Sequence, residues 1–239
     1  MASGSIIIVR HGRTVFNATG RLQGRTDNPL DEVGLAQAEA VARYLQPELL
    51  PDALFICSPL LRARQTATAI VERVGNSYEI DERWIELDYG AYEGLRQAEV
   101  PADVWRSWRS DNNFAAPNGE SLNQVQERVS HACDDLAHRL DGRTAVVVSH
   151  VSPIKSAVAW ALGVDVSVGW RTQLVTASIT RLSVSAHGAA LTSFNEVARS
   201  GLGPTKLSWP PISGGFPMRR ICDPSVTFAT LNESALYVP

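Results

Sequence analysis

The stretch IIIVRHG, residues 6–12, decides the fold. Its four β-branched residues form a continuous apolar run, which is typical of a strand buried on both faces of a parallel sheet. The polar residues that follow would then emerge at the carboxyl edge of that sheet. A second run of this kind, residues 145–148, is followed by Ser149 and His150. The sequence therefore predicts that His11 and His150 reach the sheet edge where ligands usually bind.

Strands and helices alternate along the rest of the chain. Strands are expected at about 53–57, 78–80, 178–183 and 190–194, and helices at about 35–45, 59–74, 122–140 and 153–162. Ser58 and Pro59 suit the N-cap and first position of the second helix, and Ser121 suits the N-cap of the third. This alternation predicts an α/β fold, a three-layer α/β/α sandwich with a mostly parallel central sheet and helices on both faces.

The length of 239 residues suits one α/β domain with a full hydrophobic core. The character of the sequence changes from about residue 198, where glycine and proline become frequent. We therefore expect a domain over residues 1–197 and a Gly/Pro-rich C-terminal appendage over residues 198–239, either wrapped on the domain or partly disordered.

The composition limits which classes of partner and which cellular compartment are expected for the protein. Its net charge is −3, from 22 basic and 25 acidic side chains, so a nucleic-acid surface is not expected. No apolar run is long enough for a signal segment or a membrane span. The three cysteines, Cys57, Cys133 and Cys222, have no metal-ligand spacing and suit a reducing compartment, so a cytoplasmic protein without membrane contact is expected. A homodimer is compatible with the sequence, which does not decide the oligomeric state.

Two arginines accompany the histidines. Arg10 adjoins His11, and Arg62 lies in the first turns of the helix that follows the second strand. Guanidinium groups match phosphate oxygens, and the N-terminus of a helix favours anions. Together these groups predict a phosphate site. The alternative is that the histidines are hydrogen-bonded structural residues and that Arg62 is a solvated helix residue.

A set of motifs carries a family resemblance. Arg10-His11-Gly12, with Thr14 and Asn17 following, resembles the opening signature of the histidine phosphatase superfamily, the phosphoglycerate mutase-like proteins. The segments SPLLRARQTA (58–67), ELDYGAYEG (86–94), PNGES (117–121) and VSH (148–150) are similar to its later motifs and follow in the same order. The resemblance covers about residues 6–195 and is to the branch of broad-specificity and alpha-ribazole phosphatases.

The resemblance implies a role for each matching residue. His11 would be the nucleophile that becomes phosphorylated, and Arg10, Arg62 and His150 would bind the phosphate. Asn17 would give a side-chain donor to the same phosphate. Gln23 and Gly24, in the segment Arg21-Leu22-Gln23-Gly24, would lie beside the substrate.

Glu86 would be the general acid for the leaving oxygen and later the base that activates water. Asp88 and Glu93 are further candidates from the residues alone, and the resemblance selects Glu86. Burial, or the charge of a bound phosphate, is expected to raise the pKa of Glu86, whereas the surrounding cations disfavour protonation of His11. Arginines and a histidine can hold the phosphoryl charge, so no metal and no cofactor are expected.

The chain departs from the family pattern at Val151, where many relatives have glycine. The Val151 backbone N–H can still bind substrate, although the side chain would alter the rim of the pocket. Trp105, Trp108 and Phe114 lie in the insert between the acid motif and Gly119. They would either supply an apolar wall for the leaving group or pack within the fold.

These features favour a metal-independent phosphomonoester hydrolase that acts on a small phosphorylated metabolite. A cofactor-dependent phosphoglycerate mutase is the first alternative, but only about 25 residues separate Gly94 from Gly119, and the long polar insertion of such mutases is missing. A non-catalytic phosphate-binding regulatory module is the second alternative. The natural substrate does not follow from the sequence.

Overall fold

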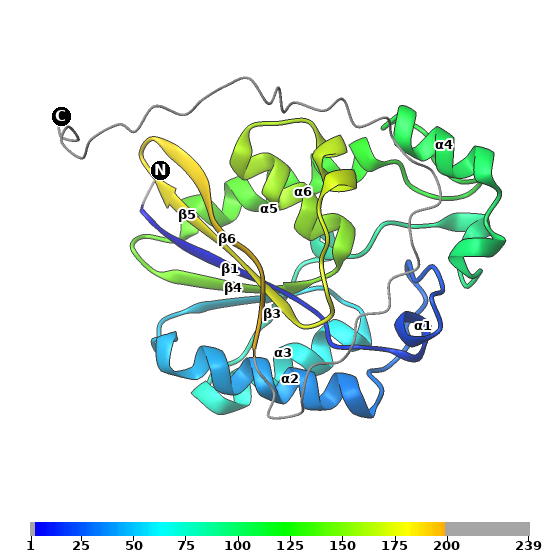
Figure 1. Ribbon diagram of the computed structural model, residues 1–239. Helices are drawn as coiled ribbons and strands as arrows, with labels where there is room; N and C mark the ends of the chain where they lie inside the picture. The colour runs from blue at the N-terminus through cyan, green and yellow to red at the C-terminus, as the bar shows by residue number, and fades with distance from the viewer. Residues whose placement is uncertain (1–2, 199–239) are drawn as a thin grey trace, which may run out of the picture. The chain divides into compact units, whose positions relative to one another are not determined.

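A computed structural model describes residues 3–198 of the chain. Its centre is one six-stranded sheet in the order β3-β2-β4-β1-β5-β6 (Figure 1). The strands are β1 (Gly4–Arg10), β2 (Leu54–Cys57), β3 (Glu79–Ile80), β4 (Thr144–Ser149), β5 (Ser178–Ser185) and β6 (Gly188–Val197). The first four run parallel, whereas β5 is antiparallel to β1 and to β6. The predicted mostly parallel sheet is confirmed.

Helices cover both faces of this sheet (Figure 1). The helices α2 (Glu32–Leu45) and α3 (Leu61–Val74) pack together on one face, and α5 (Leu122–Arg139) and α6 (Val151–Leu162) pack together on the other. Two shorter helices, α1 (Val15–Ala18) and α4 (Ala102–Ser110), lie in the connections. Short 3-10 turns occupy 46–48, 82–84, 90–92, 97–99 and 166–171. The fold is the predicted three-layer α/β/α sandwich.

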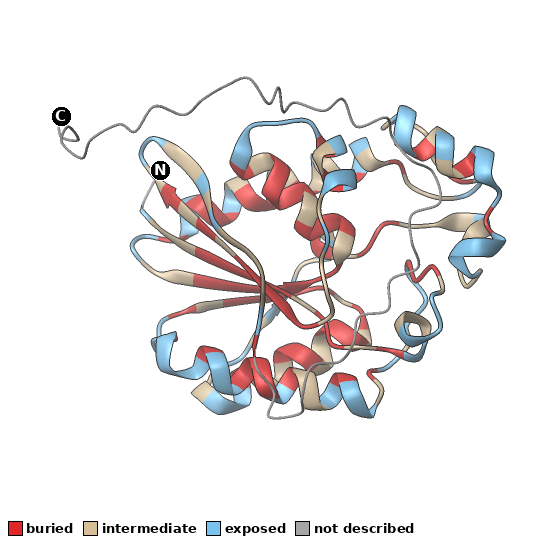
Figure 2. Cartoon of the chain, in the orientation of Figure 1, coloured by how far each residue is buried: buried red, intermediate tan, exposed pale blue. Residues whose placement is uncertain are grey.

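Strand β1 lies between the two halves of the core. Ile6 and Ile8 belong to the apolar cluster that includes residues of α5 and α6, whereas Ile7 and Val9 belong to the cluster that includes residues of α2 and α3. All four are buried, as Figure 2 shows for the strands at the centre of the sheet. Because successive side chains of a strand point to opposite faces, a strand covered on both sides must be apolar throughout. This requirement explains the apolar run that precedes His11.

Three helices begin at residues other than those expected. Helix α3 begins at Leu61 and not at Pro59, because Ser58 extends the β ladder: its N–H donates to the Val148 carbonyl at 3.0 Å. Helix α2 begins at Glu32, three residues early, because Asp31 caps it. Helix α6 begins two residues early, directly after His150.

The prediction for Ser121 is confirmed. Its hydroxyl accepts a hydrogen bond from the Gln124 N–H at 3.2 Å and so caps α5.

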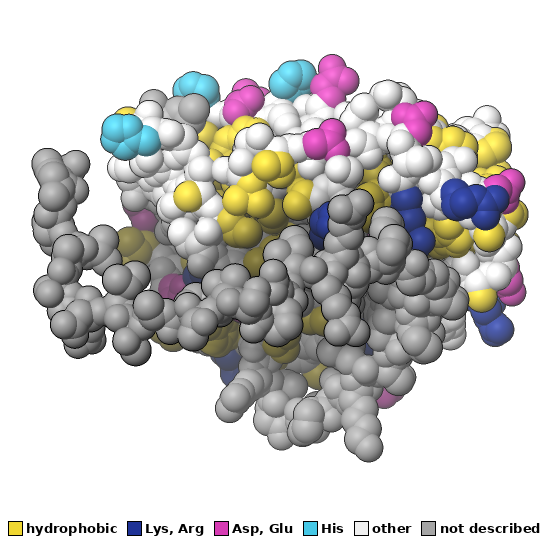
Figure 3. All heavy atoms as spheres, turned by 45° about the horizontal axis from the view of Figure 1, so that its top comes forward, with side chains coloured by type: hydrophobic (Ala, Val, Ile, Leu, Met, Phe, Trp, Pro, Cys, Tyr) yellow, Lys and Arg dark blue, Asp and Glu magenta, His cyan; other side chains and the backbone are white. Residues whose placement is uncertain are grey.

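The predicted appendage lies outside the described residues, apart from Ala198. Within residues 3–198, no helix has both the length and the apolar character that a membrane crossing needs. On the described part of the face in Figure 3, hydrophobic side chains lie across the middle, acidic and histidine side chains lie mainly along the upper part, and basic ones lie mainly toward the right.

Candidate active site

His11 lies at the carboxyl end of the central strand. Its backbone N–H donates to the Ser149 carbonyl at 3.0 Å, which extends the pairing of β1 with β4 by one residue. Its ring Nδ1 is 2.7 Å from the Gly12 carbonyl oxygen. A carbonyl only accepts hydrogen bonds, so Nδ1 carries the proton and Nε2 keeps its lone pair. The Arg62 Nε donates toward this Nε2 at 3.3 Å.

The surroundings keep the His11 ring neutral. Burial, reinforced by the positive charges of Arg62 and Arg10, holds the pKa of His11 well below its ordinary value. The predicted effect of the cations on His11 is confirmed in direction, and burial is the larger cause. A neutral imidazole with its proton on Nδ1 presents Nε2 as a nucleophile.

Arg62 is fully buried in the first turn of α3. Its Nη2 donates to the Gly24 carbonyl at 2.7 Å and its Nη1 to the Thr26 carbonyl at 2.8 Å. Burial lowers the pKa of Arg62 to about 10, which leaves the guanidinium charged near neutral pH. Gly24, which was expected beside the substrate, thus contributes its carbonyl to the orientation of Arg62.

Arg10 is the second cation of the site. Its Nη1 donates to the Leu174 carbonyl at 2.5 Å, and its Nε has no hydrogen-bond partner among the described residues. Burial lowers the pKa of Arg10 to about 10, against the raising effect of the nearby Glu86 charge. Arg10 also lowers the pKa of Arg62, so the two guanidiniums lie close enough to repel each other. An anion between them would relieve that repulsion.

His150 lies beside His11, with 5.0 Å between the ring centroids and an interplanar angle of 55°. It follows β4 directly and occupies the N-cap position of α6. Its Nε2 is 2.6 Å from the Ser58 hydroxyl, whereas its Nδ1 is buried and has no partner among residues 3–198. Burial and the charge of Arg62 hold the pKa of His150 well below its ordinary value.

Asn17 and Gln23 are joined through Thr14. The Thr14 hydroxyl is 2.6 Å from Gln23 Oε1 and 3.1 Å from Asn17 Oδ1, and the Thr14 N–H donates to the same Asn17 oxygen at 3.1 Å. Because the oxygens of both amides are engaged, their nitrogens remain as donors. The buried Nε2 of Gln23 has no partner within the described part of the chain.

Glu86 is 4% exposed and lies against the N-terminus of α6. Its Oε1 accepts from the Leu87 N–H at 2.8 Å and the Ser152 N–H at 3.1 Å, and its Oε2 accepts from the Val151 N–H at 3.1 Å. The Val151 N–H, expected to bind substrate, therefore contacts Glu86 instead. The physical reason is that a carboxylate at a helix N-terminus takes up the free N–H groups of the first turn.

Burial separates Glu86 from the two other candidate carboxylates. Asp88 is partly exposed and lies 3.5 Å from the Arg25 guanidinium, and the partly exposed Glu93 accepts a hydrogen bond from the Thr26 N–H. Among the described residues, no three His, Cys, Asp or Glu side chains are grouped as a metal-ion site would require.

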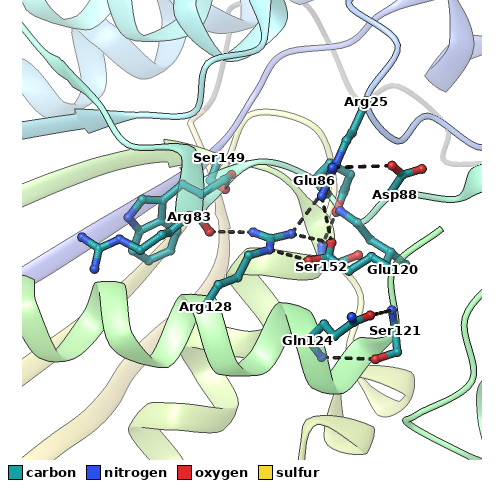
Figure 4. A network of polar contacts seen from close by, with 12 residues as sticks. Arg25, Arg83, Glu86, Asp88, Glu120, Ser121, Gln124, Arg128, Ser149 and Ser152 are labelled. Carbon is teal, nitrogen blue, oxygen red and sulfur yellow. Dashed lines mark hydrogen bonds and ion pairs between the residues drawn. The ribbon is translucent and has the colours of Figure 1, made fainter. Parts of the chain in front are cut away.

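A network of charged side chains holds the Glu86 segment (Figure 4). Arg128 of α5 makes a two-pronged contact with Glu120, at 2.8 and 2.9 Å. Its other bonds reach the Arg83 carbonyl at 2.6 Å and the Glu86 carbonyl at 3.3 Å. Arg25 lies 3.5 Å from Glu120 on the same network. Sequence reasoning missed Arg128, because a lone arginine on a helix gives no signal of a partner 42 residues away.

The tryptophans of the insert pack within the fold. Trp108 is buried, with the rings of Tyr89, Tyr92, Trp105 and Phe114 at centroid distances of 5.3 to 5.9 Å. Three of the four pairs are edge-on, the arrangement that aromatic rings prefer. For Trp108 the packing alternative is therefore the right one.

The fold is that of a phosphoglycerate mutase-like α/β protein, with two histidines, two arginines and a buried carboxylate near the carboxyl edge of its sheet. A sequence profile described as histidine phosphatase superfamily (branch 1) matches residues 6–197. The chain belongs to this superfamily.

Individual relatives agree with this assignment. The chain is 36% identical to phosphoserine phosphatase 1 of Hydrogenobacter thermophilus over 169 residues. These aligned residues cover 69% of this chain and 79% of that protein. It is 30% identical over 181 residues to a probable phosphoglycerate mutase of Yersinia pestis, with coverage of 74% and 83%. A mycobacterial glucosyl-3-phosphoglycerate phosphatase, solved with VO3, has a TM-score of 0.73 at 30% identity, with coverage of 80% and 98%.

Other relatives are longer proteins. A bifunctional protein of Mycobacterium tuberculosis is 35% identical over 188 residues, which is 77% of this chain and 51% of that protein. The chain thus spans about half the length of the first curated relatives that it matches.

Proposed function

We propose that this protein hydrolyses phosphomonoesters of small metabolites through a phosphohistidine on His11, without a metal ion. The observation that carries the proposal is the state of the His11 ring. Its Nδ1 is tied to the Gly12 carbonyl at 2.7 Å, and its Nε2 lone pair lies beside the Arg62 Nε at 3.3 Å. A neutral imidazole fixed in this way is set to attack a phosphorus atom held by the same guanidinium.

In the first half-reaction, His11 Nε2 forms a bond to phosphorus while the bond from phosphorus to the ester oxygen breaks. Glu86 gives its proton to the leaving oxygen, which departs as an alcohol. The Nδ1–H bond to Gly12 stabilises the positive charge that the ring gains. Arg10, Arg62 and the donor groups of His150, Asn17 and Gln23 hold the phosphoryl oxygens.

In the second half-reaction, water attacks the phosphorus of phosphohistidine. Glu86, now a carboxylate, takes a proton from that water, and the bond between Nε2 and phosphorus breaks. Inorganic phosphate leaves, and His11 and Glu86 return to their starting states. The two guanidiniums supply the positive charge that a metal ion supplies in other phosphoryl-transfer sites.

A small phosphorylated metabolite is the substrate class that the relatives favour. Phosphoserine phosphatase and glucosyl-3-phosphoglycerate phosphatase are each named for such an ester. The VO3 bound to the latter is an oxyanion of the size of a phosphoryl group. We further propose that residues 1–197 form the catalytic domain, which agrees with the extent of the family match.

A mutase is a second candidate because of the Yersinia relative. A mutase returns the phosphoryl group to a bound product before water can attack. The mutase reading predicts turnover of phosphoglycerate that depends on a bisphosphorylated primer, with little release of inorganic phosphate. Phosphatase activity predicts phosphate release that needs no primer.

The proposal is tested by hydrolysis of p-nitrophenyl phosphate from mildly acid to neutral pH in excess chelator. We expect activity in the wild type and loss of about three orders of magnitude or more in His11→Ala. His138→Ala is the matched control, because the Nδ1 of this exposed histidine also contacts a backbone carbonyl, at 2.7 Å. Activity that chelator removes, or that His11→Ala retains, would contradict the proposal, and no wild-type activity would favour the mutase or the binding module.

A further inference from the structure

Ser58 is buried against His150 and has no part in the proposed reaction. It follows β2 directly, and its N–H pairs with the Val148 carbonyl of β4 at 3.0 Å. Its hydroxyl oxygen lies 2.6 Å from His150 Nε2 and 3.4 Å from the Leu60 nitrogen. Backbone groups therefore contact both the N–H and the hydroxyl of Ser58. The hydroxyl also lies against one nitrogen of the His150 ring.

The direction of the hydrogen bond between Ser58 and His150 follows from counting donors and acceptors. A hydroxyl has one proton to donate, and a buried hydroxyl proton without an acceptor costs free energy. The Leu60 N–H can only donate, so His150 Nε2 is the acceptor that the described contacts offer to the Ser58 proton. Nε2 must then carry a lone pair, which leaves the single proton of a neutral imidazole on Nδ1.

We propose that Ser58 is a positioning residue that fixes the proton of His150 on Nδ1 and so makes the neutral ring a hydrogen-bond donor to the phosphoryl group. Nδ1 is the ring nitrogen without a partner among residues 3–198. The ring itself lies 5.0 Å from that of His11. The opposite tautomer would turn a lone pair toward an anion, which is repulsive.

The position of the proton matters because the His150 ring is neutral. Burial and the Arg62 charge hold the pKa of His150 well below its ordinary value, so a second proton is not available near neutral pH. A neutral histidine donates through one nitrogen only. The assignment of the tautomer rests on the contacts of Ser58 alone, whereas the contact with a phosphoryl group rests on the proposed function.

The tautomer is measured by long-range proton–nitrogen NMR on protein labelled at its five histidines. The spectrum distinguishes Nδ1–H from Nε2–H rings, and His150→Gln identifies the signals of His150. We expect the Nδ1–H form in the wild type and in Ser58→Thr, and a substantial fraction of the Nε2–H form in Ser58→Ala. Ser156→Ala is the control, because it removes another buried serine hydroxyl, one without a partner among the described residues.

The consequence is measured by calorimetric titration of the same variants with inorganic phosphate, which needs no turnover. We expect weaker affinity in Ser58→Ala, by up to about tenfold according to how far the Nδ1–H fraction falls, and unchanged affinity in Ser156→Ala. An Nε2–H ring in the wild type, or an unchanged spectrum and affinity in Ser58→Ala, would overturn the proposal. If Ser58→Ala does not fold, the wild-type spectrum alone decides. An inactive wild type with the expected spectrum would contradict the proposed function and not the assignment of Ser58.

Discussion

The hydroxyl of Thr66 accepts a hydrogen bond from the Gly12 N–H at 3.1 Å and donates one to the Arg62 carbonyl at 2.8 Å. Thr66 is fully buried. One side chain of α3 therefore joins the loop that carries His11 to the turn that carries Arg62. We therefore expect the relative position of His11 and Arg62 to depend on this contact.

Thr66→Ala should lower both stability and activity. The Gly12 N–H would be buried without a partner, which costs about 1–3 kcal/mol of unfolding free energy. A shifted His11 should reduce kcat by about tenfold or more, because reacting groups tolerate little displacement. Denaturant unfolding and steady-state kinetics measure the two effects. Thr66→Ser keeps the hydroxyl and should restore most of both, and a Thr66→Ala enzyme with wild-type kcat would contradict this role.

Stability should fall as the pH is lowered through the histidine range. The folded state depresses the pKa of His11 and His150, so the unfolded chain binds more protons below the unfolded pKa of about 6.5. Stability is therefore fully present above that pH and is lost below it, by at most about 1.4 kcal/mol per pH unit for each ring. Unfolding midpoints from pH 7 to 5 measure the slope.

His11→Asn removes one of the two rings and supplies the comparison for this pH dependence. Its unfolding free energy should fall less steeply below pH 6.5 than that of the wild type. A wild-type stability that stays constant from pH 7 to 5 would contradict the burial of two neutral histidines.

Glu86→Gln should separate esters by their leaving groups. An alkyl phosphate needs a proton on its leaving oxygen, so kcat should fall by about 10²–10⁴. The first half-reaction of p-nitrophenyl phosphate should suffer much less, because its phenolate leaves without a proton. Pre-steady-state kinetics on both esters measures this difference. Asp88→Asn is the matched control and should reduce the rate of the first half-reaction only weakly, and by the same factor for both esters. An equal loss of that rate for both esters in Glu86→Gln would contradict the acid role.

Trp108→Ala should destabilise the protein more than it affects binding. The ring is buried among four other aromatic rings, so its loss should cost about 3–5 kcal/mol of unfolding free energy. The KM for a small ester should change by less than about threefold if the ring only packs. Thermal unfolding and kinetics below the transition test this, and a large rise in KM with unchanged stability would favour a wall of the pocket instead.

Local patterns were sufficient to predict the framework of the fold. The apolar run of residues 6–9 predicts a strand with both faces covered, and the structure divides its side chains between two core clusters. The positions of His11 and His150 directly after paired strands follow from the same reasoning. These predictions succeed because a short run of consecutive residues shows both whether a strand is buried on its two faces and which residue follows its carboxyl end.

Contacts between distant segments could not be predicted in this way. The sequence around Ser58 and Pro59 fits a helix N-cap as well as a strand end. Only the hydrogen bond of Ser58 with His150, which is 92 residues away in the sequence, indicates its role. Thr66 gives no signal of Gly12, 54 residues away. The Val151 N–H contacts Glu86 because of how the acid segment meets α6, and no local pattern encodes that meeting.

His11 carries the phosphoryl group in the proposed reaction, and trapping that intermediate tests this role most directly. Glu86→Gln should form the phosphoenzyme from p-nitrophenyl phosphate and should hydrolyse it slowly, because the base for water is missing. After rapid quenching at alkaline pH, peptide mass spectrometry should find one phosphoryl group on His11, stable in alkali and lost in acid. A phosphoryl group on another residue, or steady turnover with none on the protein, would contradict the account.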